Sequence, residues 1–302
     1  MFARLIKQFL IVVCFISTTS LSAAEQTADK ERILHPKGLL WKIEKSGASP
    51  SFVFGTMHVS HQQVVTLAEP VERAFANADR FAMEVLLNFQ AVGVITSRSF
   101  FNDGRTLKTL MQPDDFKKLS QLMQSKFSMT ENMFMHMRPW MVFTMLMMPP
   151  EEMGKDNSAL DMVLYRRAAM RKIPLLGLET ADEQLDVLEA GSIDDQIWML
   201  NKTVEEYDQI SQQFSEMVTA YIDRDLAKLV IMQEQSMYDD SEIDDRFLEQ
   251  LIDMRNARMV ERMQSYLQTG NAFIAIGALH LPGEKGVLHL LELQGYSVSS
   301  VY

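Results

Sequence analysis

The sequence has one cysteine in 302 residues, and this residue, Cys14, lies inside an N-terminal apolar run. Once that run is removed, the chain has no thiol. Disulfides, thiolate nucleophiles and thiolate metal ligands are then excluded. With 47% apolar residues, the chain can still bury a substantial core. We therefore expect a globular protein whose stability depends on apolar packing.

Several common catalytic motifs are also missing. The sequence has no Gly-rich phosphate loop, no Gly-x-Ser-x-Gly motif and no HExxH motif. These absences argue against the usual NTPase, serine hydrolase and zincin mechanisms. Basic residues are outnumbered, with 29 Lys and Arg against 40 Asp and Glu, and the net charge is −11. This negative charge disfavours nucleic acid or an anionic membrane as a partner.

Residues 1–24 have the pattern of a secretory signal peptide. Arg4 and Lys7 precede the apolar run Phe9–Ile16, and a small-residue segment, 22–24, follows it. We predict cleavage before Glu25 and export to the periplasm or the medium. An uncleaved anchor is the alternative. The run is too short to span a bilayer, and no later segment is long enough, so we expect no integral membrane segment in the mature chain.

The remaining chain is interpreted as a loose polar segment, 25–37, followed by one domain, 38–302. Strand-like patterns occupy 39–45, 51–55, 80–87, 172–179, 271–277 and 296–302. Helical patterns occupy 70–78, 106–148, 157–172, 181–267 and 286–293, with Ser158 as a candidate N-cap. This order predicts an α/β fold with a central mixed or mostly parallel sheet, flanking helices and a large helical insertion. The Met-rich end of 106–148 is interpreted as core filler rather than as a metal-binding box.

A Gly-x-x-His motif occurs twice, as Gly55 to His58 and as Gly277 to His280. Each motif follows a strand-like apolar run, so each histidine is expected at the carboxyl end of a strand. Ligands of open α/β sheets bind at this edge. The glycines would permit a sharp turn or a close backbone approach. We predict that the two imidazoles share one crevice, with two unrelated loop histidines as the alternative.

Glu84 is the one charged residue in the apolar run 81–87. A buried carboxylate is costly unless it is paired or bound to a cation. If its strand neighbours the other two, His58, Glu84 and His280 form a set of two histidines and one carboxylate. Such a set suits a divalent metal ion with open coordination positions. In the alternative, Glu84 reaches the strand end and caps a loop.

Four further polar residues are candidates for the same site. Arg255 falls within the apolar stripe of a predicted helix, and Asn256 borders that stripe. A substrate contact and an internal salt bridge explain Arg255 equally well. Glu179 ends a predicted strand, and Asp161 lies on the helix before it. Among the other histidines, His61 is left open as a ligand or a loop residue, and structural or surface roles are assigned to His35, His136 and His289.

Taken together, five segments resemble the TraB/GumN-like family, which includes pheromone-shutdown proteins and the Tiki metalloproteases. They are FVFGTMHV, AMEV, LLGLET, MRNARM and GALHLPGEKGVLHLLELQGY. The resemblance extends over about 38–302. It implies a fold similar to those of erythromycin esterase and ChaN-like proteins. It also implies metal-dependent peptidase activity on peptide or protein, with manganese or cobalt as the suggested ion and zinc as an alternative.

By position, the resemblance makes His58 and His280 the paired family histidines and Glu84 the family glutamate. Arg255 and Asn256 match the Arg-Asn pair of the family's late helix. One departure is that many members have an acidic residue shortly after the glutamate, whereas 85–87 are Val, Leu and Leu here.

The resulting hypothesis is an exported, metal-dependent hydrolase. His58, Glu84 and His280 would hold the ion, and Glu84 or Glu179 would act as general base. Arg255, with Asn256, would stabilise the oxyanion or grip a substrate carboxylate. Gly55, Gly277 and Asp161 would support the site. The alternatives are a non-catalytic binding protein that sequesters a peptide, a metal or a haem-like ligand, and an enzyme acting on a polysaccharide or an ester. The sequence does not predict the oligomeric state.

Overall fold

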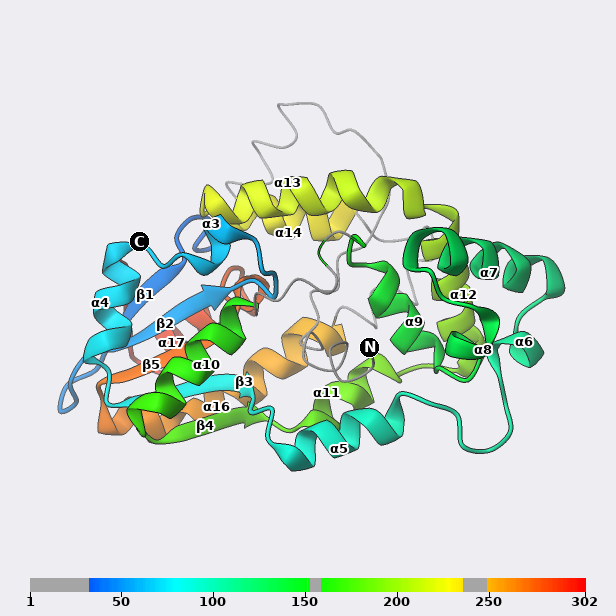
Figure 1. Cartoon of the computed structure of the whole chain (residues 1–302). Helices are drawn as coiled ribbons and strands as arrows, with labels where there is room; N and C mark the ends of the chain where they lie inside the picture. The colour runs from blue at the N-terminus through cyan, green and yellow to red at the C-terminus, as the bar shows by residue number, and fades with distance from the viewer. Residues whose placement is uncertain (1–32, 151, 153–158, 236–248) are drawn as a thin grey trace.

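The computed structural model describes residues 33–150, 152, 159–235 and 249–302. Its centre is a six-stranded sheet with the order β4-β3-β5-β2-β1-β6. The strands are β1 (Leu40–Glu44), β2 (Ser51–Thr56), β3 (Arg80–Val85), β4 (Leu175–Glu179), β5 (Ala272–Gly277) and β6 (Ser297–Ser300). The predicted α/β class is confirmed, because four adjacent strands are parallel and the sheet is mixed (Figure 1).

The strand directions follow from the connections. β1 and β2 form the predicted hairpin, in which Leu40 pairs with Phe54, and β6 returns antiparallel to β1. β5 lies between β2 and β3 and is parallel to both. Its residues 272–276 are all buried, as the continuous apolar sequence indicates for a central parallel strand.

Helices fill the two long connections on either side of β4. Between β3 and β4 lie α5 (Phe89–Arg98), α6 (Leu107–Leu110), α7 (Pro113–Phe127), α8 (Glu131–Phe134), α9 (Pro139–Leu146) and α10 (Leu160–Arg171). Between β4 and β5 lie α11 (Ala181–Leu188), α12 (Ile193–Glu205), the 3₁₀ turn η2 (Tyr207–Gln209), α13 (Ile210–Ile222), α14 (Leu226–Gln235), the π-helical turn η3 (Glu249–Asp253) and α16 (Met254–Thr269). Figure 1 shows that much of this material, α6–α9 with α12, lies beside the sheet as the predicted helical insertion.

The two faces of the sheet are covered by different helices. On one face, α4 (Glu69–Asn77) and α10 lie against each other, because Arg171 of α10 donates to the carbonyls of Phe75 and Ala76 at the end of α4. The Phe75 ring packs edge-on against Phe81 of β3. Side chains alternate across a strand, so Glu84 lies on the face opposite Phe81. This opposite face is covered by α16, which also packs against α17 (Val287–Leu293).

The Met-rich block forms core. Met141, Met145 and Met147 at α9 are each at most 6% exposed. Flexible thioether side chains fill such irregular interior space well. The interpretation as core filler is consistent with these positions.

Some boundaries differ from the sequence-based ones. The strand predicted from 172 begins at Leu175, since Lys172 adopts a left-handed conformation that ends α10. The N-cap position of α10 is Ala159, which makes no side-chain cap, and Ser158 lies outside the described residues. Helix α5 was not predicted, although Asn88 caps it by accepting the Ala91 N–H.

The predicted signal peptide, 1–24, and most of the segment 25–37 lie outside the described residues. The last part of that segment is described from Ile33, which packs against Ala227 and Ile231 of α14. Within the described part of the chain, no helix is long and apolar enough to cross a membrane.

Candidate functional site

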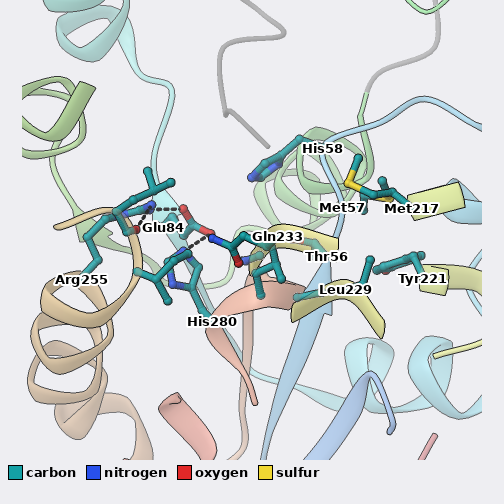
Figure 2. A pocket seen from close by; sticks show the side chains of 15 residues that line it. Thr56, Met57, His58, Glu84, Met217, Tyr221, Leu229, Gln233, Arg255 and His280 are labelled. Carbon is teal, nitrogen blue, oxygen red and sulfur yellow. Dashed lines mark hydrogen bonds and ion pairs between the residues drawn. The ribbon is translucent and has the colours of Figure 1, made fainter. Parts of the chain in front are cut away.

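The carboxyl ends of three adjacent parallel strands meet at one pocket. Thr56 at the end of β2 pairs in register with Gly277 at the end of β5, and β3 lies on the other side of β5. The pocket encloses about 60 Å³. It is lined by Thr56, Met57, His58, Glu84, Met217, Tyr221, Leu229, Gln233, Leu251, Ile252, Arg255, Gly277, Ala278, Leu279 and His280. The three predicted ligands, His58, Glu84 and His280, thus line the same pocket (Figure 2).

His58 is held by a carboxylate from α10. Its Nδ1 atom lies 2.5 Å from Oδ2 of Asp161, and the Thr56 hydroxyl donates to Oδ1 of the same carboxylate over 2.5 Å. Asp161 stands in the first turn of α10 and is 2% exposed. Burial lowers the pKa of His58, but the charge and hydrogen bond of Asp161, with the charge of Glu84, outweigh it and raise the pKa. Because Nδ1 is engaged, Nε2 is the ring nitrogen that could bind a ligand.

His280 is held in a similar way by an amide. It ends η4 (Ala278–His280), the turn after β5, and its Nδ1 lies 2.7 Å from Oδ1 of Asn256. Asn256 donates its own Nδ2 to the carbonyl of Lys285, which fixes its orientation. His280 Nδ1–H is therefore the donor, and Nε2 lacks the proton when the ring is neutral. Burial, with the positive charge of Arg255, lowers the pKa of His280 to about 3.

Glu84 is surrounded by donors. Its Oε1 accepts the Gly277 N–H at 2.7 Å, and its Oε2 lies 2.5 Å from Nη2 of Arg255 and 3.0 Å from Nε2 of Gln184. Oε1 also lies 3.9 Å from Nε2 of His280. Burial raises the pKa of Glu84, but the Arg255 charge leads a group of opposing contacts that lower it to about 2. Glu84 thus bonds the last residue of β5 and lies beside His280, and its role as a ligand stays a prediction.

Arg255 joins Glu84 to the second predicted carboxylate, Glu179. Its Nε and Nη2 atoms lie 2.9 and 2.7 Å from Oε2 of Glu179, and Arg258 reaches the other oxygen at 3.3 Å. Gln184 donates to both carboxylates. The side chain of Glu179 is fully buried, and Glu179 does not line the pocket. The internal salt bridge that the sequence left open for Arg255 therefore exists, and its contact with substrate stays a prediction.

Both glycines of the repeated motif stand where little room is left for a side chain. A Cβ on Gly55 would come within 2.7 Å of Leu281, so β2 packs closely on the turn after β5. A Cβ on Gly277 would lie 3.2 Å from Oε1 of Glu84 and 3.4 Å from Cδ2 of His280. The glycine at 277 thus leaves room for both of these side chains and supplies the N–H that Glu84 accepts.

The donor chemistry of the pocket fits a divalent metal ion. Ligating histidines usually bond a carboxylate, carbonyl or water through their second ring nitrogen, and Asp161 and Asn256 occupy that place for His58 and His280. Glu84 supplies the oxygen donor. The side chains of the described residues, however, include no group of three or more His, Cys, Asp or Glu positioned to hold an ion. The three-ligand set therefore stays a prediction.

Sequence reasoning gave no role to Gln184, which lies behind the pocket, or to the apolar residues that line it. Gln184 bridges two carboxylates, and the one available signal was its position in the helix directly after the strand that ends at Glu179. The apolar wall of Met57, Met217 and Leu229 comes from a loop and two separate helices. No local pattern links these three residues, since only the tertiary fold brings them together.

The fold and pocket define an α/β protein with paired imidazoles and a carboxylate at the strand ends. The profile of the TraB/PrgY/gumN family matches residues 39–300, so the chain belongs to this family. No solved structure matches the chain to a significant degree.

Among curated proteins, the chain is similar to several named metalloproteases. It is 23% identical to metalloprotease TIKI2 of Danio rerio over 86% of this chain and 60% of that protein. It is 23% identical to metalloprotease TIKI1 of Xenopus tropicalis over 96% of this chain and 66% of that protein. It is 22% identical to the Homo sapiens TIKI1 over 86% of this chain and 61% of that protein. The chain thus spans about three fifths of the length of these relatives.

Proposed function

We propose that the protein is an exported, metal-dependent hydrolase that acts on peptide or protein. One observation supports this most strongly. His58, Glu84 and His280 come from the ends of three adjacent strands and line one pocket, and the Nδ1 atom of each histidine is engaged by a separate side chain. The names of the relatives, which describe metalloproteases, point in the same direction.

His58 and His280, through Nε2, and Glu84, through Oε1, would hold the ion. A divalent ion supplies Lewis-acid polarisation of a carbonyl and lowers the pKa of a water molecule. Manganese or cobalt is the ion implied by the family, and zinc also accepts this ligand set. Ligating imidazoles must be neutral. Because the pKa of His58 is raised, a proton would compete with the ion at this residue up to a higher pH than at an ordinary histidine.

Of the two carboxylates considered as general base, Glu84 is within reach, but it would serve as base instead of as ligand, because its Oε2 is already bonded to Arg255 and Gln184. It lines the pocket, whereas Glu179 does not. The low pKa of Glu84 keeps it in the proton-accepting form, although it makes the residue a weak base. Glu179 would instead position Arg255, since it contacts both Nε and Nη2 of that guanidinium.

Arg255 would stabilise negative charge on the substrate through an N–H donor that its contacts within the protein leave free. Nη2 bonds both carboxylates, and Nη1 donates to the Leu251 carbonyl. A guanidinium has five N–H donors, so a second Nη1 hydrogen is left for a substrate oxygen. Asn256 acts by fixing His280 rather than by touching substrate, because it bonds His280 and Lys285 and does not line the pocket.

The proposal is tested by turnover. The chain from residue 25 onward is incubated with a mixed peptide library, with manganese, with cobalt, with zinc and with a chelator. We expect cleavage that requires a metal ion and disappears in the His280→Ala variant. Tight binding of peptide without cleavage under every metal condition would contradict the proposal and favour the non-catalytic binding protein.

A further inference from the structure

The pocket has two chemically different sides. Glu84, Arg255 and His280 lie on one side in Figure 2, and Met57, Met217 and Leu229 lie on the other, where His58, Thr56 and Gln233 also line the pocket. The polar side, with His58, accounts for the chemistry proposed above. The apolar side chains have no part in that chemistry, although they face the same space.

The apolar side is formed by side chains from three separate elements, and we call it the apolar wall. Met57 follows β2, Met217 lies on α13, and Leu229 lies on α14. Each of the three is at most 6% exposed. Helices α13 and α14 run side by side along the top of the molecule (Figure 1) and contact each other. Three separate elements thus present apolar side chains to one space beside the imidazoles.

The ring of Tyr221 extends this wall. The hydroxyl of Tyr221 donates to the carbonyl of Gly55 over 2.9 Å, so its polar atom is bonded to the backbone. All charged or ionisable side chains of the lining, apart from Tyr221, belong to the polar side or to His58. A charged group placed against the wall would lose hydration, and the nearest ionisable side chain, His58, is already bonded to Asp161, so little would offset that cost.

The size of the space limits what can fill it. An apolar cavity of about 150 Å³ holds a benzene ring. At about 60 Å³, this pocket is well below that size. It therefore suits a branched or linear aliphatic side chain better than an aromatic one. Methionines in the wall can adjust to aliphatic groups of different shape.

We propose that the apolar side binds a medium-sized aliphatic side chain of the substrate, of the Leu, Met or Val class, next to the bond that is cleaved. Met217 and Leu229 are the specificity-determining residues. The place of this side chain beside a cleaved bond rests on the hydrolase function proposed above. The preference for aliphatic groups rests on the wall alone.

Binding is measured first, on metal-free protein, so that the result does not depend on turnover. The chain is labelled with ¹³C at the methionine methyl groups and titrated with N-acetyl-leucinamide, N-acetyl-phenylalaninamide and N-acetyl-aspartamide. We expect the Met57 and Met217 signals to shift with the leucine amide, less with the phenylalanine amide and not with the aspartate amide. Met170, which is 74% exposed on α10, should not respond. Equal shifts with all three amides, or none with the leucine amide, would overturn the proposal.

Turnover is measured second, on peptides that differ at one residue. We expect kcat/KM to favour leucine over aspartate by about tenfold or more in the unchanged protein. Met217→Gln should reduce this preference to a few-fold, and the matched variant Met170→Gln should leave it intact. Turnover without preference would refute the aliphatic site while leaving the hydrolase proposal in place. Failure of all turnover would refute the hydrolase, and the methyl shifts would still decide the binding preference.

Discussion

Oδ1 of Asn256 lies 2.7 Å from Nδ1 of His280, although the two residues belong to different elements, α16 and the turn after β5. This contact holds a buried imidazole in one tautomer. Burial and the nearby Arg255 charge also lower the pKa of His280 to about 3 from an ordinary 6.5. His280 is therefore neutral in the folded, metal-free protein under all mild conditions.

The stability of the metal-free protein should depend on pH through His280. Between pH 6.5 and about 3 the unfolded chain binds a proton at His280 that the folded chain does not, so stability falls as pH falls. From pH 7.5 to 5, His280 should account for a loss of about 2 kcal/mol. This loss of unfolding free energy is measured by denaturant unfolding of the unchanged protein and of His280→Gln at both pH values. His58, whose pKa is raised, makes a contribution to the pH dependence of stability that is opposite in sign. It is present in both proteins, so the comparison between them isolates His280. Equal pH dependence in the two would show that His280 titrates normally.

Glu84→Gln tests whether the charge of Glu84 matters beyond packing. The amide oxygen can still accept the Gly277 N–H, but the amide nitrogen then faces the donors of Arg255 and Gln184. We expect the protein to fold with a loss of about 1–3 kcal/mol. Metal affinity and peptide turnover should both fall sharply. Calorimetric metal titration and the peptide assay check these outcomes, and unchanged values in both would remove Glu84 from the ligand set.

Asp161→Asn tests the support of His58. The carboxylate accepts from both His58 and Thr56, one at each oxygen. The amide of asparagine has a single accepting oxygen, so it can accept from only one of these two donors. We expect metal affinity to fall by about 10- to 100-fold while the fold is retained. Asp114→Asn, on the exposed face of α7, is the control and should bind metal normally. An affinity unaltered by Asp161→Asn would mean that His58 needs no such partner.

Gly277→Ala tests the close approach at the end of β5. The added Cβ would press on Glu84 and His280, at 3.2 and 3.4 Å. We expect a loss of about 1 kcal/mol or more, together with weaker metal binding. The control is Gly93→Ala within α5, where a Cβ meets nothing within 4 Å. This control should stabilise the protein by roughly 0.5–1 kcal/mol, because alanine favours a helix over glycine. A Gly277→Ala protein with normal stability and metal affinity would show that the site tolerates the methyl group.

The sequence predicts the sheet and its edge well for physical reasons. Continuous apolar runs at β3 and β5 are typical of buried parallel strands, and glycine followed by histidine predicts where β2 and β5 end. The placement of His58, Glu84 and His280 at one pocket follows from strand adjacency. The family resemblance is also confirmed, since the profile matches nearly the whole domain.

The partners of the site residues could not be predicted from local patterns. Gln184 reaches Glu84 because α11 begins at the end of β4 and β4 lies beside β3 in the sheet. No local sequence pattern predicts which strands are neighbours. Met217 and Leu229 look like ordinary core positions of amphipathic helices, because burial against a pocket and burial against a core require the same residue types. The sequence marks Arg255 as an unusual residue within an apolar stripe. Its ion pair could not be predicted, because the position of Glu179 relative to Arg255 depends on the tertiary fold.

The most direct test of the metal-dependent site is elemental analysis of the purified chain from residue 25 onward, after equilibration with manganese, cobalt or zinc. We predict about one bound ion per chain, and little or none in His58→Ala and in His280→Ala. The double variant should lose no more than either single variant, because removal of one ligand already empties the site. One ion per chain retained in both single variants, or no binding of any of the three metals by the unchanged protein, would contradict the account.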